Sequence, residues 1–272
     1  MNILVPVDFS ECSQNALNFS IELAKKLDAN VFVLHSYRLT KPFGRINPGK
    51  TMSIRDELDT DSNERFERLK KKIGDDPGVP LKYIVDIGFA VDTISSNVKE
   101  YDINLIVMGT KGNGMIHQVF GSTTLNVIKK VDCPVLTVPA DVSFNGLREI
   151  AIASDYDKKQ DIRTFKILNE ISTDLHAHLH VLTLNSSQRV TDEEIESGEL
   201  KLTPYFPDHD LEYHFRSASD VEDGLNNLVE DLHAHMLVLI PRTRELFKSL
   251  FGKSVTKSMI LHSRLPIMAL PA

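Results

Sequence analysis

The sequence contains no tryptophan and only two cysteines, Cys12 and Cys133, in 272 residues. The two cysteines do not have the spacing of a metal or redox motif, and sparse thiols are typical of a reducing compartment. No apolar run approaches the roughly 20 residues that a helix needs to cross a bilayer. The first residues, MNILVPVDFS, show neither the basic region nor the cleavage site of a signal peptide. We therefore expect a cytoplasmic protein with no disulfide and no membrane partner.

The chain also has fewer basic than acidic residues. The chain has 31 Lys and Arg against 38 Asp and Glu, which gives a net charge of -7. Such a chain has no electrostatic attraction for bulk nucleic acid, so we expect no nucleic-acid partner. This argument does not exclude the binding of a small anion by backbone amides. An apolar content of 42% and a charged content of 25% are globular values, and the length suits one large domain or two ordinary ones.

The sequence contains an internal repeat. The matching segments, aligned without gaps, are Ile3–Asp8 with Ile150–Asp155, Leu105–Met108 with Leu237–Ile240, Ser122 with Ser254, and Pro134–Pro139 with Pro266–Pro271. The last three pairs share a single offset. We therefore expect two tandem domains, residues 1–141 and 148–272, joined by the polar segment Asp141–Leu147.

Apolar runs of strand length alternate with segments of helical periodicity. In the first half the expected strands are Asn2–Asp8, Asn30–Ser36, Leu81–Asp86, Leu105–Gly109 and Val135–Val138, and the expected helices are Ser13–Leu27, Ser62–Ile73, Ala90–Glu100 and Ser122–Lys130. Strands this apolar are buried on both faces, so helices should cover both sides of a parallel sheet. The pattern predicts an α/β protein made of two doubly wound, Rossmann-like domains, each with a five-stranded parallel sheet flanked by helices.

A glycine-rich loop joins one of these strands to a helix. Gly109 ends the strand, Gly112 lies in the loop, and Gly121 precedes Ser122 and Thr123 at the helix start. Glycines let a backbone approach a phosphate closely, and a helix N-terminus offers free N–H groups and partial positive charge. Turn glycines after a strand are the alternative interpretation. The strand–loop–helix context favours a phosphate site.

This stretch resembles the universal stress protein family. The family's phosphate motif is Gly, two residues, Gly, nine residues, Gly, then Ser or Thr, and the second spacer here has eight residues, 113–120. The segment Ile3–Ser10 is similar to the family's first strand with its Pro-x-Asp loop, and Val31–Ser36 is similar to its second strand. The resemblance covers the first half well and the second half more loosely.

The resemblance implies an adenine nucleotide, ATP with Mg²⁺, at the carboxyl ends of the first-half strands. The residues that match the family's binding positions are Pro6, Val7, Asp8, Ser36, Met108, Gly109, Gly112, Gly121, Ser122 and Thr123. In the family, Asp8 would contact the ribose or a phosphate-bound metal, and Ser36 would touch the adenine through its backbone. A helix cap or a turn is the alternative role for Asp8. His35 is expected to be a packed strand residue.

The second half departs from this motif. The positions of Gly109, Gly112 and Gly121 are taken by Pro241, Arg244 and Lys253. Proline removes an N–H donor, and the two long cations occupy space that glycine leaves open. We therefore expect one nucleotide per chain, held by the first half.

The last strand of each half would be a bare edge in a five-stranded order, and bare apolar edges invite aggregation. The resemblance implies that Pro134–Val138 and Pro266–Leu270 pair within one chain and so form an internal pseudo-dimer. Whether the whole chain forms a homodimer is not decided by the sequence.

Histidines gather where two second-half helices lead into strands, in His176-Ala177-His178-Leu179-His180 and in His233-Ala234-His235. Exposed turn histidines are the expected interpretation. Zinc bridging His176 or His178 to His233 or His235 is the alternative.

The resemblance implies a regulatory or stress-survival protein that binds ATP and is not an enzyme. The sequence contains no G-x-S-x-G, H-E-x-x-H or G-x-x-x-x-G-K-[ST] motif. Any ATP hydrolysis would be slow, because no residue is evidently placed to activate water. Two other functions stay open, a scaffold that recruits a partner without nucleotide and a slow ATP hydrolase or nucleotidyl transferase. The short glycine spacer favours the scaffold.

Overall fold

The computed structural model describes residues 1–37, 63–110, 122–153, 162–185, 202–217, 221–240 and 263–271. The elements of the first half are β1 Asn2–Pro6, α1 Glu11–Leu27, β2 Asn30–Tyr37, a helical stretch over residues 63–73, β3 Leu81–Ile87, α3 Ala90–Glu100, β4 Leu105–Thr110, α4 Ser122–Lys130 and β5 Val135–Pro139. Those of the second half are β6 Glu149–Ala153, α5 Ile162–Asp174, β7 His178–Asn185, the 3₁₀ turn η1 Thr203–Tyr205, β8 Leu211–Ser217, α7 Val221–Asp231, β9 Met236–Leu239 and β10 Ile267–Ala269.

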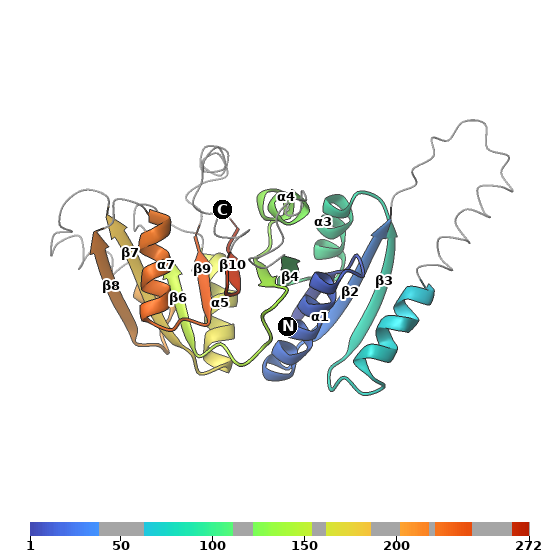
Figure 1. Cartoon of the computed structure of the whole chain (residues 1–272), viewed down its shortest axis with the longest axis horizontal. Coiled ribbons are helices and arrows are strands. Elements are labelled where there is room, and N and C mark those ends of the chain that lie inside the picture. The colour runs from blue at the N-terminus through green and yellow to red at the C-terminus, as the bar shows by residue number, and fades with distance from the viewer. Residues whose placement is uncertain are drawn as a thin grey trace, which may run out of the picture.

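The strands form one ten-stranded sheet in the order β3-β2-β1-β4-β5-β10-β9-β6-β7-β8. Every neighbouring pair is parallel except β5 and β10, which are antiparallel. The two five-stranded halves lie side by side, with β3 and β8 at the outer ends of the sheet (Figure 1). The predicted α/β fold class, with parallel strands flanked by helices, is confirmed.

The sheet is covered on both faces because its strands are apolar on both faces. Ile3 and Val5 of β1 pack into one core with α1 and with the helical stretch 63–73. Leu4 points the other way, into a core with α3 and α4. All three side chains are fully buried. A continuous apolar run therefore builds a central strand between two helical layers.

Four helices are each followed by a residue in the left-handed backbone conformation. Asp28, Asp102, His176 and His233 each have φ between 46° and 51°, and each lies between a helix and the next strand. Polar side chains tolerate this left-handed conformation better than branched ones do. His176 and His233 are exposed, so they are turn histidines, as the sequence favours.

The segment between the halves packs against α1. The Asn15 side-chain amide donates to the carbonyl oxygens of Pro139 and Val142, each at 2.9 Å. The Phe144 ring lies 5.2 Å from the Phe19 ring, edge to face, and Leu147 is buried. The polar segment predicted as a linker thus supplies two apolar anchors to the core.

Neither cysteine forms a disulfide. Burial, helped by the neighbouring Asp132 carboxylate, raises the pKa of the Cys133 thiol to about 12. A thiol this hard to ionise is a poor nucleophile and a poor redox group. Among the helices that the structure describes, none has the length and apolar character to cross a membrane.

The contact between the halves is a strand pairing. Ile267 lies opposite Thr137, Met268 opposite Leu136, and Ala269 opposite Val135. The Thr137 hydroxyl also donates to the Ile267 carbonyl oxygen at 3.1 Å. Every residue of both strands is buried.

This pairing predicts a pattern of amide hydrogen exchange along the sheet. We expect amides of β5 and β10 to exchange as slowly as those of β1 and β9, because both strands have hydrogen-bonded neighbours on each side. Strands β3 and β8 end the sheet and provide the open-edge reference in the same molecule. Exchange in β5 as fast as that in β3 would rule out the pairing in solution.

Candidate functional site

Among the described strands of the first half, the topological switch point lies between β1 and β4. These strands are parallel neighbours, with Ile3 opposite Leu105. From β1 the chain proceeds outward through β2 to β3, whereas β4 is followed by β5 on the other side. Parallel sheets bind ligands in the crevice outside the carboxyl ends of two such strands. Pro6 ends β1 and Thr110 ends β4, so the matched residues of both strands lie at this edge.

Gly109 is required by helix packing. It lies within β4, opposite Val138 of β5. A Cβ atom at this position would overlap the Cys12 carbonyl oxygen and lie 2.5 Å from the Cys12 carbonyl carbon. Both atoms belong to the backbone of the first turn of α1, which cannot move aside as a flexible side chain would. The missing side chain therefore lets α1 lie directly on β4.

Asp8 takes part in the start of α1. Its Oδ1 atom accepts hydrogen bonds from the Ser10 amide at 3.0 Å and from the Ser10 hydroxyl at 2.5 Å. Ser10 is the N-cap, and its hydroxyl accepts from the Ser13 amide at 3.3 Å. The local structure thus matches the turn-and-cap interpretation of Asp8. The Asp8 side chain is nevertheless exposed, so the same carboxylate is also open to a ligand.

The Asp8 carboxyl is a stronger acid than usual. Partial removal from water acts to raise its pKa, but hydrogen bonds from Ser10, and then from Ser13, outweigh that effect and lower the pKa below its ordinary 3.8. Hydrogen bonds to the ionised form favour that form. Asp8 therefore carries a full negative charge at the edge of the switch point at neutral pH.

His35 has a structural role beside the loop after β1. Its Nδ1 lies 2.8 Å from the Val7 carbonyl oxygen, which can only accept, so Nδ1 carries the proton. The ring lies 4.6 Å from the Phe9 ring, and Phe9 has a positive φ of 63°. The Val7 amide in turn donates to the Leu34 carbonyl oxygen at 2.7 Å. These contacts hold the backbone of the loop, and they match the packed role expected for His35.

Two other predicted site residues are also held in place. The Ser36 hydroxyl lies 2.5 Å from the Thr93 hydroxyl, which itself donates to the Ala90 carbonyl oxygen at 3.0 Å. Met108 is buried in the core shared with α3 and α4. The Ser36 hydroxyl is half-buried and engaged with Thr93, and Met108 is buried.

The remaining predicted residues lie at the start of α4 or outside the described part of the chain. Ser122 is the first residue of α4, and Thr123 follows it and is exposed. Gly112 and Gly121 lie outside the described residues. The structure therefore brings together Pro6 to Asp8 with Gly109, and it adds the α1 N-terminus, which sequence reasoning did not include.

A hollow of about 340 Å³ with three basic side chains in its walls opens beside the loop after β1. Its walls are Phe9, Gln14, Arg65, Arg68, Leu69 and Lys72. Lys72 donates to the Gln14 side chain at 2.8 Å, and the Arg65 guanidinium lies 5.7 Å from the centre of the Phe9 ring. Sequence reasoning missed this hollow, because its three cations come from the helical stretch 63–73 and reach the loop only through tertiary packing.

Comparison with known proteins assigns the family. The model of the universal stress protein family matches residues 1–139. The chain belongs to the universal stress protein family. Universal stress protein MJ0531 of Methanocaldococcus jannaschii is 30% identical over 137 residues, which are 50% of this chain and 80% of that protein. Universal stress protein YxiE of Bacillus subtilis is 29% identical over 144 residues, 50% of this chain and 97% of that protein.

A likeness over the whole chain comes from a solved structure. A universal stress protein from Archaeoglobus fulgidus aligns with 99% of this chain and 98% of its own, with a TM-score of 0.80 and 18% identity. At that identity the likeness establishes the shared fold, including the second half that the family model does not reach.

This universal stress protein also has a cluster of possible metal ligands in its second half. His180, Glu212 and His214 bring their ligand atoms together within 4.8 Å. Burial lowers the pKa of His214, the Glu212 carboxylate opposes this, and His180 and Arg216 lower it further. The sequence singled out His180 as one of a histidine run. It did not indicate Glu212 and His214, although their i, i+2 spacing places them on one strand face.

The packing at Gly109 predicts a loss of stability on substitution. Gly109→Ala should reduce the free energy of unfolding by about 1–3 kcal/mol, because overpacking against backbone forces a shift of α1 or β4. Thermal and urea unfolding of the purified chain would measure it. A fully stable Gly109→Ala variant would show that α1 does not lie on β4 as described.

The Asp8 network predicts a pH-dependent stability. The folded-state pKa lies below 3.8, so the stabilisation is complete above about pH 3.8 and is lost as the pH falls through the lowered pKa. Asp8→Asn should therefore be less stable than the wild type at pH 6, and the difference should shrink toward pH 3. Asp8→Ala is the control, because it also removes the acceptor oxygen and should stay less stable at both pH values. A constant difference for Asp8→Asn would contradict the ionic role.

Proposed function

We propose that this universal stress protein binds one adenine nucleotide, ATP, at the switch point between β1 and β4. The observation that carries this proposal is the arrangement of two sequence matches at one edge of the sheet. The segment Pro6–Asp8 and the strand end at Gly109 match the family's first strand and the start of its phosphate motif, and β1 and β4 are neighbours. Residues 1–141 would form the nucleotide-binding domain, and residues 148–272 a second domain.

The local electrostatics support an anionic ligand. Helix α1 begins at Glu11 beside the end of β1, and α4 begins at Ser122 after the glycine loop. Helix N-termini carry free N–H groups and partial positive charge, which attract phosphate. In this proposal Gly112 and Gly121 allow the backbone approach, Ser122 and Thr123 offer N–H and hydroxyl donors, and the adenine lies near the backbone of Ser36.

Magnesium suits the same edge. Mg²⁺ in nucleotide sites is held by one or two carboxylates together with phosphate oxygens and water. Asp8 is exposed and ionised at neutral pH, with Oδ1 oriented by Ser10. Asp8 would hold the ion, which would supply charge neutralisation to the phosphates when bound. This role is compatible with the cap network, because a carboxylate has two oxygens.

The proposed activity is regulatory binding rather than turnover. His35, the histidine nearest this edge along β2, has its Nδ1 proton directed at the Val7 carbonyl oxygen and its ring against Phe9. These contacts account for His35 as a residue that holds the loop, without assigning it a catalytic role. A general base needs a direct or water-mediated hydrogen bond to the attacking group.

A scaffold that binds no nucleotide is the second candidate. Gly109 supports it, because packing on Cys12 accounts for this glycine without any ligand. The two candidates differ in what a bulky residue at Gly121 does to ATP affinity.

We expect Gly121→Val to weaken ATP binding about 10- to 100-fold, equivalent to the loss of one or two charge-assisted hydrogen bonds to phosphate. The side chain would occupy the path of the phosphate, whereas the sheet would stay intact. Calorimetric titration of the full-length chain with ATP and Mg²⁺ would measure affinity and stoichiometry, and circular dichroism would check the fold.

Lys253→Val is the matched control in the second half and should leave the affinity unchanged. The wild type should bind one nucleotide per chain. Unchanged affinity in folded Gly121→Val, or no binding by the wild type, would favour the scaffold. Loss of binding in Lys253→Val alone would place the nucleotide in the second half.

A further inference from the structure

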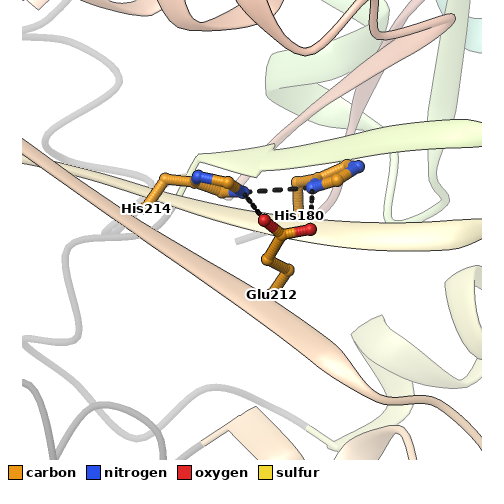
Figure 2. A group of neighbouring side chains, drawn as sticks. All are labelled: His180, Glu212 and His214. Carbon is orange, nitrogen blue, oxygen red and sulfur yellow. Dashed lines mark hydrogen bonds and ion pairs between the residues drawn. The ribbon is translucent and has the colours of Figure 1, made fainter.

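Two histidines and a glutamate converge on one face of the second half of the sheet (Figure 2). His180 of β7 lies directly opposite Glu212 of β8, and Leu182 lies opposite His214. Because side chains alternate between the faces of a strand, His180, Glu212 and His214 project to the same side. This is the side of Leu182 and of the core under α7.

The geometry points to a divalent-metal site of the zinc class formed by His180, Glu212 and His214. The closest ligand atoms are His180 Nδ1 and His214 Nε2, 3.1 Å apart, and the Glu212 carboxylate oxygens lie 3.3 Å from the first and 3.5 Å from the second. A tetrahedral zinc ion with bonds of about 2.0–2.1 Å has ligand atoms about 3.3 Å apart. The two imidazole nitrogens are close to this separation, and the carboxylate presents one oxygen to each of them, Oε2 to His180 and Oε1 to His214.

The identity of the donors supports the same metal class. Two imidazoles and one carboxylate are ligands of borderline cations such as Zn²⁺, whereas Ca²⁺ and Mg²⁺ prefer oxygen alone. Three protein ligands leave a fourth position for water or another ligand. The Glu212 side chain is 66% exposed, so the cluster is open to an entering ion, whereas the His180 side chain is 9% exposed.

A second carboxylate orients the buried histidine. Glu149 of β6 lies 2.9 Å from His180 Nε2, so Nε2 carries a proton and donates it. With that proton on Nε2, the nitrogen available to a metal is Nδ1, which faces His214 and Glu212. A carboxylate on the far nitrogen of a metal-binding histidine is the usual outer-shell arrangement, because it sets the tautomer and strengthens the ligand.

Two carboxylates flank the ring of His180 in this cluster. Glu149 lies 2.9 Å from Nε2 and Glu212 lies 3.3 Å from Nδ1. Arg216, next on the same face of β8, is paired with Asp231 at 3.0 Å. A dication would bind both imidazoles and Glu212 directly, with Glu149 as the outer-shell carboxylate.

The first half shows that the fold does not need these residues. In register, Phe32 and Lys82 take the positions of His180 and Glu212, and Ile84 takes that of His214. The Lys82 ammonium lies 5.8 Å from the centre of the Phe32 ring and 4.0 Å from that of the Tyr101 ring. The same backbone frame is thus filled by a cation–π group in one half and by metal ligands in the other.

The site is distinct from the proposed nucleotide site. Glu149 is the first residue of β6, Glu212 the second of β8 and His180 the third of β7. The cluster therefore lies toward the amino ends of its strands, whereas the nucleotide is proposed at carboxyl ends of strands in the other half. A metal bound here would leave the first-half site intact.

The test is zinc and cobalt binding by the full-length chain after chelator treatment, without nucleotide. We expect calorimetry to find one Zn²⁺ per chain and Co²⁺ to give the visible spectrum of a four-coordinate site. Glu149→Gln should weaken Zn²⁺ about 10- to 100-fold, as outer-shell changes do. His214→Ala and Glu212→Gln remove ligands and should weaken it further.

Two further variants make the result decisive. The triple variant His180→Phe, Glu212→Lys, His214→Ile carries the first-half residues and should fold but bind no Zn²⁺. His214→Cys should retain Co²⁺ and add a thiolate-to-cobalt charge-transfer band, which a merely unfolded chain would not show. His176→Asn is the control, since asparagine suits its left-handed backbone, and should bind as the wild type does.

Equal Zn²⁺ affinity in the wild type and the folded triple variant would overturn the site. Absence of Zn²⁺ binding by the wild type would overturn it as well and would leave a proton-linked hydrogen-bond cluster. Loss of Zn²⁺ in His176→Asn, with His214→Ala unchanged, would place the ion at the turn histidines instead.

Discussion

The direct contact of α1 with β4 at Gly109 is the constraint on which the rest of the first half depends. No side chain separates the first turn of the helix from the strand, because a Cβ atom would overlap the backbone of Cys12. This contact places the N-terminus of α1, with the Ser10 cap and the Asp8 carboxylate, beside the carboxyl end of β4. The proposed nucleotide edge exists because two backbones can approach each other this closely.

Helix α1 also contacts the segment between the halves and the second half itself. Asn15 binds the carbonyl oxygens of Pro139 and Val142, where β5 ends, and Phe19 packs on Phe144 in the segment that follows. Helix α1 also contacts α5 of the second half. The relative position of the halves therefore rests on these α1 contacts as well as on the β5–β10 ladder. A shift of α1 would therefore change the geometry of both the switch point and this junction.

The two halves show how one backbone frame holds different chemistry. Each half has the same strand order. In each, a residue in the left-handed conformation follows a helix, Asp28 in the first half and His176 in the second. Side chains that face neighbouring strands are free to differ if their volume and polarity are satisfied locally. The Phe32–Lys82 pair achieves this with a cation–π contact, and His180–Glu212 with polar groups within hydrogen-bonding reach of each other. Internal repetition thus lets one half specialise without altering the other.

The sequence by itself determined the elements, because their signals are local. Helical periodicity predicted α3 at Ala90–Glu100 and α4 at Ser122–Lys130 with their observed ends, and the family motif directed attention to Pro6–Asp8 and Gly109. The reason for Gly109 was decided only in three dimensions, since its neighbour Cys12 is distant in the chain. The convergence of His180 with Glu212 and His214 likewise depends on the register of β7 against β8. The apolar pattern of a strand selects which face is buried, but which residues lie opposite one another on β7 and β8 is decided when the two strands pack.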